Sequence, residues 1–170
     1  MLLRNVGLED VDAYIRMRCD PAMMKDLGGP LPREGMDEKV QRDVRQAAED
    51  IAWIKMIVPE AAAPAAVAGT VTLWSHEADG HHMSEIGWMV LPAFQGQGYG
   101  KRAVRTLLEM AKEDGRWGLI HAFPATGNLP SNGICRTLGF TFVEEQSLEF
   151  AGRVLQTNHW TIDPLTHSPI

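Results

Sequence analysis

The spacing of hydrophobic residues along the chain predicts an alternation of strands and helices. In some segments apolar residues recur at i, i+3, i+4 and i+7, as on one face of a helix, and shorter apolar runs between them are typical of strands. The predicted helices cover residues 8–20, 33–50, 98–114 and 131–138. The predicted strands cover residues 2–6, 51–58, 67–74, 84–91, 119–123, 140–150 and 154–162, the last two forming a hairpin turned at Ala151-Gly152. This order predicts one mixed α/β domain over residues 1–170, without internal repeats.

The polar segment 76–82 is predicted to be a loop between two strands. It carries three histidines, so a metal site has to be weighed. No carboxylate at a fixed spacing accompanies them, and an exposed loop explains them equally well, so no metal is expected. Cys19 and Cys135 lie far apart without metal-binding spacing, which indicates free thiols in a reducing compartment.

Charge and hydropathy exclude several classes of protein. The net charge is -6 and the sequence pI is about 5.5, whereas nucleic-acid binding requires clustered Lys and Arg on a basic surface. The acidic balance weakly favours a cationic substrate. No apolar run has the length of a membrane span or of a signal peptide, so we expect a cytoplasmic protein without a membrane partner.

A glycine-rich turn lies between the strand at 84–91 and the helix at 98–114. Its sequence is Gln95-Gly96-Gln97-Gly98-Tyr99-Gly100-Lys101. Glycines at the start of a helix let a ligand approach the backbone closely, and the N–H groups of the first turn, at the positive end of the helix dipole, bind anions. Lys101 and Arg102 add positive charge. The turn therefore predicts a phosphate-binding site.

Two common phosphate-binding motifs fit this turn poorly. A P-loop requires Ser or Thr after its lysine, but Arg102 follows Lys101, and Gln95 stands where the leading glycine belongs. Residues 98–103 satisfy the weak GxGxxA fingerprint of dinucleotide-binding proteins. That fingerprint also needs an acidic residue after the next strand, and residues 119–123 offer none.

The turn does match the acyl-coenzyme A motif Q/R-x-x-G-x-G/A, through Gln95, Gly98 and Gly100. Together with residues 84–92 before it and residues 128–140 after it, the turn resembles the GNAT N-acetyltransferase superfamily. The later segment is similar to the N-x-x-S…GF segment of that family.

The resemblance is strong over residues 84–145. It is looser toward the N-terminus, where residues 20–29 look like the branch containing the ribosomal-protein N-terminal acetyltransferases. It implies a mixed, mostly antiparallel seven-stranded sheet, splayed between its fourth and fifth strands and flanked by about four helices. It further implies that acetyl-coenzyme A binds in the gap and acetylates a primary amine by direct attack in a ternary complex. The amine would belong to a protein N-terminus, a small amine or an amino-group antibiotic.

The residues expected to contact coenzyme A come from the strand end, the turn and the later helix. They are Met89, Val90, Leu91, Gln95, Gly96, Gln97, Gly98, Tyr99, Gly100, Lys101, Asn128, Ser131 and Cys135. Among them, Asn128 follows a predicted strand, where its side chain can meet pantetheine amide groups that would otherwise lie unpaired.

Glu85 and Ser131 are the candidate catalytic residues. Glu85 stands at the start of the predicted central strand and shares a face with Gly87 by period-two alternation. In the resembling acetyltransferases, a glutamate near this position activates the amine through water, although a solvated carboxylate explains Glu85 equally well. His81 and His82 are weaker alternatives for the base.

The usual general acid of the family, a tyrosine four residues after Ser131, is replaced here by Cys135. A thiol matches that role poorly, so either the coenzyme A thiolate leaves without an acid or Ser131 acts through water. The departure leaves a second function open, that of a non-catalytic acyl-coenzyme A sensor with the same fold. The sequence also leaves open the acceptor amine and whether the protein forms a homodimer.

Overall fold

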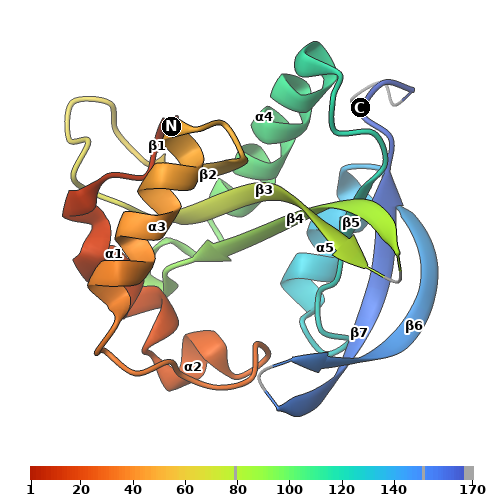
Figure 1. Cartoon of the computed structure of the whole chain (residues 1–170), viewed down its shortest axis with the longest axis horizontal. Helices are drawn as coiled ribbons and strands as arrows, with labels where there is room; N and C mark the ends of the chain where they lie inside the picture. Colours follow the sequence, from red (N-terminus) through yellow and green to blue (C-terminus); the bar gives the residue numbers. More distant parts are fainter. Residues whose placement is uncertain (79, 151, 167–170) are drawn as a thin grey trace.

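In the computed structural model, which describes residues 1–78, 80–150 and 152–166, the chain forms a seven-stranded sheet flanked by five helices (Figure 1). The strands are β1 (Leu2–Asn5), β2 (Ala52–Val58), β3 (Gly69–Ala78), β4 (His81–Val90), β5 (Ile120–Ala122), β6 (Thr141–Phe150) and β7 (Arg153–Ile162). The helices are α1 (Val11–Arg18), α2 (Pro21–Met24), α3 (Met36–Ala48), α4 (Tyr99–Asp114) and α5 (Leu129–Thr137). Short 3-10 turns occupy Leu8–Asp10 and Pro92–Phe94.

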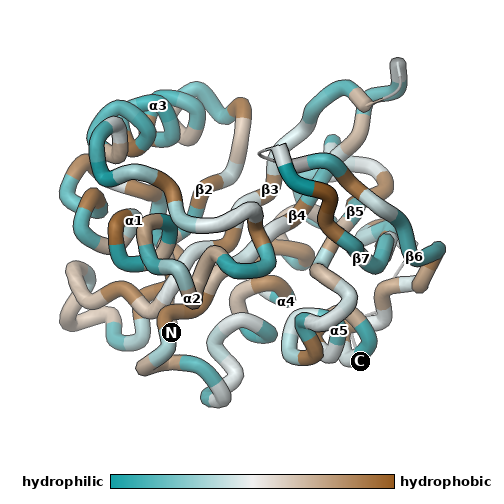
Figure 2. The backbone as a smooth tube through the Cα atoms, turned by 90° about the horizontal axis from the view of Figure 1, so that it is seen from below, coloured by the Kyte–Doolittle hydropathy of each residue, from teal (hydrophilic) through white to brown (hydrophobic). Residues whose placement is uncertain are grey.

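The sheet separates two hydrophobic cores, because its central strands are apolar on both faces. One core lies between the sheet and helices α4 and α5, and the other lies beneath α1, α2 and α3 (Figure 2). Ile86 of β4 packs into the first core and Met89 of the same strand into the second. Strand residues of opposite parity therefore face different sets of helices.

The strand order is β1-β2-β3-β4-β5-β7-β6, and the neighbours are antiparallel except for β4 and β5. β4 pairs with β3 along its whole length. Its pairing with β5 is limited to two register pairs, Ser84 with Ile120 and Glu85 with His121. Among the described residues, β4 has no strand partner on that side after Glu85. The predicted mixed sheet, splayed between its fourth and fifth strands, is confirmed.

Two local predictions were wrong. Residues 76–78 and 81–82 belong to strands and not to the predicted polar loop, because β3 and β4 continue into this segment and pair up to Ala78 and His81; residue 79 lies outside the described residues. Backbone pairing needs no apolar side chains, so a hairpin can extend beyond the core with polar residues. The chain also has a fifth helix, α2, which begins at Pro21, where the sequence predicted only the end of α1.

Local capping explains this extra helix. Pro21 occupies its first turn, where the missing N–H costs nothing, and the Asp20 carboxylate accepts a 2.8 Å hydrogen bond from the Met23 N–H. The other predicted elements are present with shifted ends. The predicted turn at Ala151-Gly152 includes Ala151, which lies outside the described residues.

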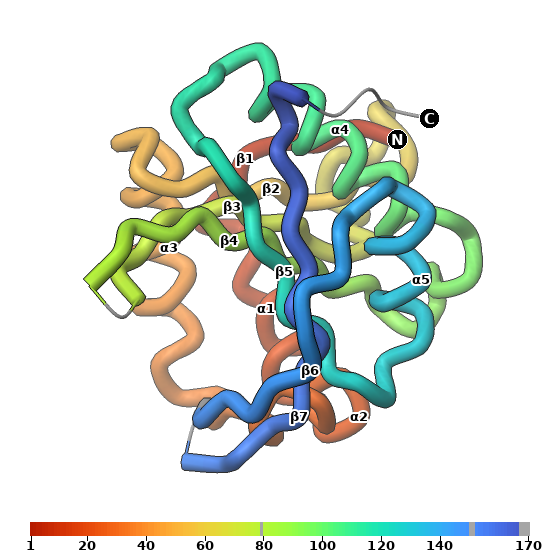
Figure 3. The backbone as a smooth tube through the Cα atoms, turned by 90° about the vertical axis from the view of Figure 1, so that its right-hand side faces the viewer, coloured from red at the N-terminus to blue at the C-terminus, as the bar shows by residue number. Residues whose placement is uncertain are grey.

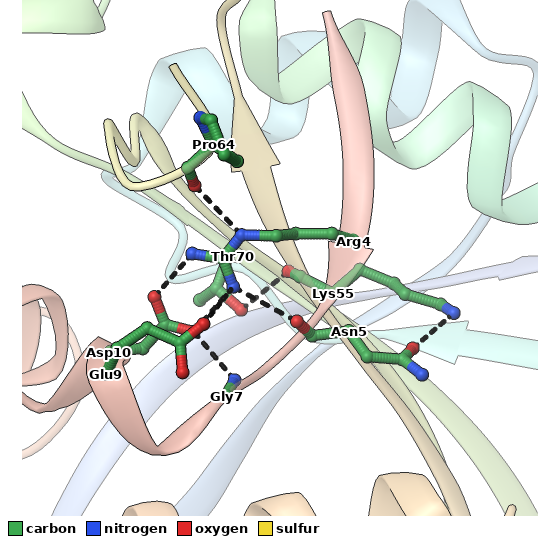
Figure 4. Close-up of polar contacts among 8 residues, drawn as sticks. All are labelled: Arg4, Asn5, Gly7, Glu9, Asp10, Lys55, Pro64 and Thr70. Atoms are coloured by element: carbon green, nitrogen blue, oxygen red, sulfur yellow. Dashed lines mark hydrogen bonds and ion pairs between the residues drawn. The ribbon is translucent and has the colours of Figure 1, made fainter. Parts of the chain in front are cut away.

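Arg4 fixes the N-terminal strand to its surroundings (Figure 4). Its guanidinium donates two 2.7 Å hydrogen bonds to the buried Asp10 carboxylate and a 2.9 Å bond to the Pro64 carbonyl. Asp10 also accepts a bond from the Gly7 N–H. A bidentate arginine–carboxylate pair of this kind supplies geometry as well as charge compensation. It holds β1 against the start of α1 and against the loop between β2 and β3.

Candidate functional site

The glycine-rich turn stands at the N-terminus of α4, directly after β4. Gly96 and Gly98 have φ angles of 74° and 78°, in the left-handed region that favours glycine, and Gly98 is the residue before the helix. The N–H groups of Tyr99, Gly100 and Lys101 have no acceptor within the helix because no helical turn precedes them, and Gly98 has no side chain to cap them. These groups and the helix dipole form an anion-binding position.

Gly98 and Gly100 serve different purposes in this turn. A Cβ atom added at Gly98 would find no heavy atom within 4 Å, so the space in front of the helix start is open. A Cβ atom at Gly100 would lie 3.2 Å from Ile134 Cδ1 and 3.3 Å from Val90 Cγ2. Gly98 is therefore required for backbone conformation and access, whereas Gly100 lets α4 pack closely against α5 and β4.

The two glutamines of the turn fold back onto the chain. Gln95 Nε2 donates a 2.9 Å hydrogen bond to the Val90 carbonyl, and Gln97 Nε2 donates a bond of the same length to the Ala93 carbonyl. In this arrangement both side chains hold the shape of the turn. Their predicted contact with a cofactor remains a prediction.

The end of β4 distributes its predicted cofactor residues over both faces of the sheet. Met89 and Leu91 are buried in the core beneath α1, α2 and α3, whereas Val90 packs on the opposite side with α4 and α5. At the splayed edge this segment exposes its backbone to a ligand, because the N–H and C=O groups on that side of β4 face no neighbouring strand among the described residues. Such an edge can hydrogen-bond an extended ligand that carries amide groups.

Asn128 and Ser131 form the N-terminus of α5. The Asn128 side-chain oxygen accepts a 3.1 Å hydrogen bond from the Ser131 N–H and so caps the helix. Cys135, one turn further on, is fully buried in the core, and burial raises the pKa of its thiol to about 12. A thiol in this state is an inert core group, and it is a weaker acid than the tyrosine it replaces.

Asn132 was not predicted as a site residue, yet it fixes the position of α5. Its side chain is 1% exposed, and Nδ2 donates 2.9 Å hydrogen bonds to the Ala125 and Asn128 carbonyls. Its Oδ1 accepts hydrogen bonds from Asn158 Nδ2 at 2.8 Å and from Trp160 Nε1 at 3.0 Å. The Asn132 amide therefore joins α5 to β7, and both its N–H groups and its oxygen are hydrogen-bonded.

Glu85 lies in the middle of β4, and not at the start of the strand as predicted. It belongs to the last register pair between β4 and β5, and its side chain is 23% exposed. Its Oε2 lies 2.9 Å from Nε2 of His76 on β3. Burial raises the pKa of Glu85, and the hydrogen bond with His76 opposes that rise. Gly87 follows on the same face, with the Trp74 ring beside it.

Two further histidines continue this row across the sheet, and neither was singled out from the sequence. His121 of β5 is the register partner of Glu85, and its Nδ1 lies 2.8 Å from Nε2 of His159 on β7. Phe123 stacks against both imidazole rings. Burial lowers the pKa of each histidine. His81 and His82, the predicted alternatives for the base, are exposed.

The hairpin of β6 and β7 reaches from this row to the other side of the site. Figures 1 and 3 show its tip beside the loop that joins α2 to α3. In that loop Gly29 is buried with a φ angle of 93°, and a Cβ atom added there would lie 3.4 Å from Arg153 Nη1. The hairpin and the loop therefore meet beside the sheet face that carries Glu85.

Neither a metal centre nor a membrane span is found in the part of the chain that the structure describes. No group of three or more His, Cys, Asp or Glu side chains there has a geometry that could hold a metal ion. None of the helices in residues 1–78, 80–150 and 152–166 combines the length and the apolar character that a membrane crossing requires.

Comparison with known proteins places this geometry in context. Residues 1–141 match the family described as the acetyltransferase (GNAT) domain. The structure is similar to that of a Salmonella typhimurium acetyltransferase that modifies the N-terminal serine of a 50S ribosomal subunit protein, with a TM-score of 0.76 and 19% identity over 95% of this chain and 93% of that one. The structure is also similar to that of a putative acetyltransferase from the same organism, solved with its cofactor acetyl-CoA. The TM-score is 0.77, and the identity is 19% over 99% of this chain and 97% of that one. For a microcin self-immunity acetyltransferase, solved with acetyl-CoA and AMP, the TM-score is 0.78 and the identity is 18% over 95% of this chain and 91% of that one.

Proposed function

Because the chain belongs to the GNAT acetyltransferase family, we propose that it transfers the acetyl group of acetyl-coenzyme A to a primary amine. The observation that carries the proposal is the free helix start behind Gly98, directly beside the strand edge that opens after Glu85. A phosphate group suits the first position and an amide-bearing chain suits the second. Structures of similar fold contain acetyl-CoA.

The residues present fit coenzyme A in two respects. The pyrophosphate would be held by the N–H groups of Tyr99, Gly100 and Lys101, where the helix dipole favours negative charge. The pantetheine amides would pair with the β4 backbone after Glu85, which has no strand partner on that side among the described residues. Asn128 and Ser131 would line the same gap from α5.

Glu85 is the group best placed to receive the proton of the amine. The amine nitrogen attacks the thioester carbonyl, the new C–N bond replaces the C–S bond, and coenzyme A leaves as its thiolate. The proton of the nitrogen passes to the Glu85 carboxylate directly or through water. An α-amine has a pKa of about 7.7–8.0 and a lysine about 10.4, so a carboxylate base suits an α-amine better. Burial, which raises the pKa of Glu85, makes it a stronger base.

No covalent intermediate on the protein is needed for this reaction. The buried thiol of Cys135, whose pKa is raised to about 12, stays protonated and is not a nucleophile. Direct attack in a ternary complex therefore agrees with the groups at hand. The acceptor is a protein N-terminus, a small amine or an amino-group antibiotic.

One observation favours the second candidate, a non-catalytic acyl-coenzyme A sensor. Cys135 stands where the family usually has its acidic tyrosine, and this thiol supplies no proton near neutral pH. The partly buried Glu85–His76 pair favours the enzyme, because a sensor has no use for a base with a raised pKa. Thiol release in the presence of a panel of primary amines decides between the two, since a sensor binds the thioester without turnover.

Acetyl-coenzyme A is expected to stabilise the folded protein. A ligand that binds only the native state adds about 2.7 kcal/mol to the free energy of unfolding at 100 times its dissociation constant. Thermal unfolding with acetyl-coenzyme A, and separately with NAD and ATP, measures the effect. A rise in the unfolding temperature with NAD that equals the rise with acetyl-coenzyme A would contradict the proposal and support dinucleotide binding.

Replacement of Gly98 by valine is expected to weaken coenzyme A binding by about 10–100-fold, the equivalent of losing one charge-assisted hydrogen bond. Its side chain would occupy the open space in front of the helix start. Gly115→Val is the matched control, because Gly115 ends the same helix with the same φ angle of 78° in open surroundings. Both variants should lose similar stability, and calorimetry should show reduced affinity only for Gly98→Val. Equal affinities would remove the turn from the site.

A further inference from the structure

We propose that His121 and His159 act as a hydrogen-bonded imidazole pair that carries the amine proton away from Glu85 toward solvent. This role rests on the proposed acetyl transfer and adds two residues to it. A base that is only 23% exposed must lose its proton before the next turnover, and its surroundings have to provide the route. The pair stands beside Glu85 on the next strand of the sheet.

Four titratable side chains form one row across four neighbouring strands. His76 of β3 hydrogen-bonds Glu85 of β4 at 2.9 Å, and His121 of β5 hydrogen-bonds His159 of β7 at 2.8 Å. The two pairs adjoin because Glu85 and His121 are register partners. Adjacent strands lie about 4.8 Å apart, so side chains at paired positions are neighbours on one face. His76 also acts on His121 electrostatically.

The geometry of the imidazole pair defines how a proton passes through it. The contact joins Nδ1 of His121 to Nε2 of His159, so one of these nitrogens donates and the other accepts. A proton that passes from Glu85 through water to Nε2 of His121 allows the Nδ1 proton to move to Nε2 of His159, whose own Nδ1 proton then leaves to solvent. The pair ends neutral with the hydrogen bond reversed, and exchange with water restores the first arrangement.

The electrostatic surroundings favour transfer in this direction. Burial lowers the pKa of both histidines, so both rings are neutral near pH 7 and able to accept a proton. Glu144 of β6, the register partner of His159, raises the pKa of that ring again, whereas His76 lowers the pKa of His121. These two contributions favour a proton on His159, the ring farther from Glu85.

The first experiment examines the pair without reference to catalysis. Nitrogen-15 NMR of the full chain should show a scalar coupling across the hydrogen bond between Nδ1 of His121 and Nε2 of His159. The coupling should disappear in His121→Asn and in His159→Asn, and remain in His82→Asn. Independent titration of the two rings without any coupling would overturn the inference.

The second experiment follows turnover in a weakly buffered solution. His159→Asn should lower turnover about tenfold, less than the 10²-fold or more expected for loss of the base itself, without changing the KM for acetyl-coenzyme A. Added imidazole should restore the rate, because a diffusing base replaces the relay. Gln156→Asn is the control, since this exposed residue lies on the strand of His159 at a position of opposite parity and has no assigned role in the site. A deficit that imidazole does not restore would indicate a structural role and contradict the relay.

A double variant separates this inference from the proposed function. If the pair acts through Glu85, His159→Asn should add little to the deficit of Glu85→Gln, because residues in one pathway are not additive. Full additivity would overturn the relay while leaving acetyl transfer intact. Absence of turnover in the unmodified protein with every amine would instead overturn the proposed function and the relay with it, and the NMR coupling would then report only a structural pair.

Discussion

Replacing Glu85 with glutamine is expected to lower turnover about 10²-fold near neutral pH, the lower end of the effect of a general base. The substitution keeps the size of the side chain and removes the carboxylate that would take the amine proton. The affinity for acetyl-coenzyme A should change little, because the cofactor is expected at the helix start behind Gly98 and along the backbone of β4. Initial rates and calorimetry on the same preparation measure the two quantities.

The pH dependence of this deficit identifies the role of Glu85. In the unmodified protein the rate should fall as the pH decreases through the pKa of Glu85, which lies above the ordinary value for a glutamate because the side chain is partly buried. In Glu85→Gln this acid limb should be lost, and the deficit should shrink at high pH, where more of the amine is already neutral. A deficit of equal size at every pH would mean that Glu85 only shapes the pocket. Glu77→Gln, at an exposed position of β3, is the control and should behave as the unmodified protein does.

Replacing Asn132 with leucine is expected to lower the free energy of unfolding by about 3 kcal/mol, since each buried polar group left without a partner costs about 1–3 kcal/mol. The substitution has a similar size but leaves Trp160 Nε1 and the Ala125 and Asn128 carbonyls without the Asn132 amide. Urea unfolding measures the loss. Asn158→Ala removes only one of these bonds, from a partly exposed side chain, and should cost about 1 kcal/mol. Equal losses in the two variants would contradict the central place of Asn132.

The parts of the fold that the sequence predicts best are those set by hydrophobic periodicity and by glycine. The helix after Gly98 begins and ends within a residue of its prediction, because its apolar face repeats regularly and Gly115 ends it with a left-handed φ angle. The splay of the sheet followed from the family resemblance. The local pattern around residues 84–91 contains no signal for where pairing with the next strand stops.

The residues that the sequence missed are polar groups whose importance depends on long-range register. His121 becomes a neighbour of Glu85 because the short pairing of β4 with β5 includes these two residues, and nothing in either segment specifies that pairing. His76 was assigned to a loop, since a strand end that extends beyond the core shows no apolar alternation. Asn132 lies in the middle of a short helix, and its hydrogen bonds to two side chains of β7 form only when β7 packs beside that helix.

The short contact between β4 and β5 also has a mechanical consequence. Among the described residues, backbone pairing between two antiparallel units, β1 to β4 on one side and β5, β7 and β6 on the other, is limited to the two rungs at Ser84 and Glu85. A change in the angle between these units moves atoms at the rungs very little. The displacement grows along the free part of β4 toward Val90, which lies about 17 Å further along at about 3.3 Å per residue. The gap between the two units can therefore widen or narrow around a bound ligand near Val90. Glu85 and His121, at the last paired position, keep their relative positions.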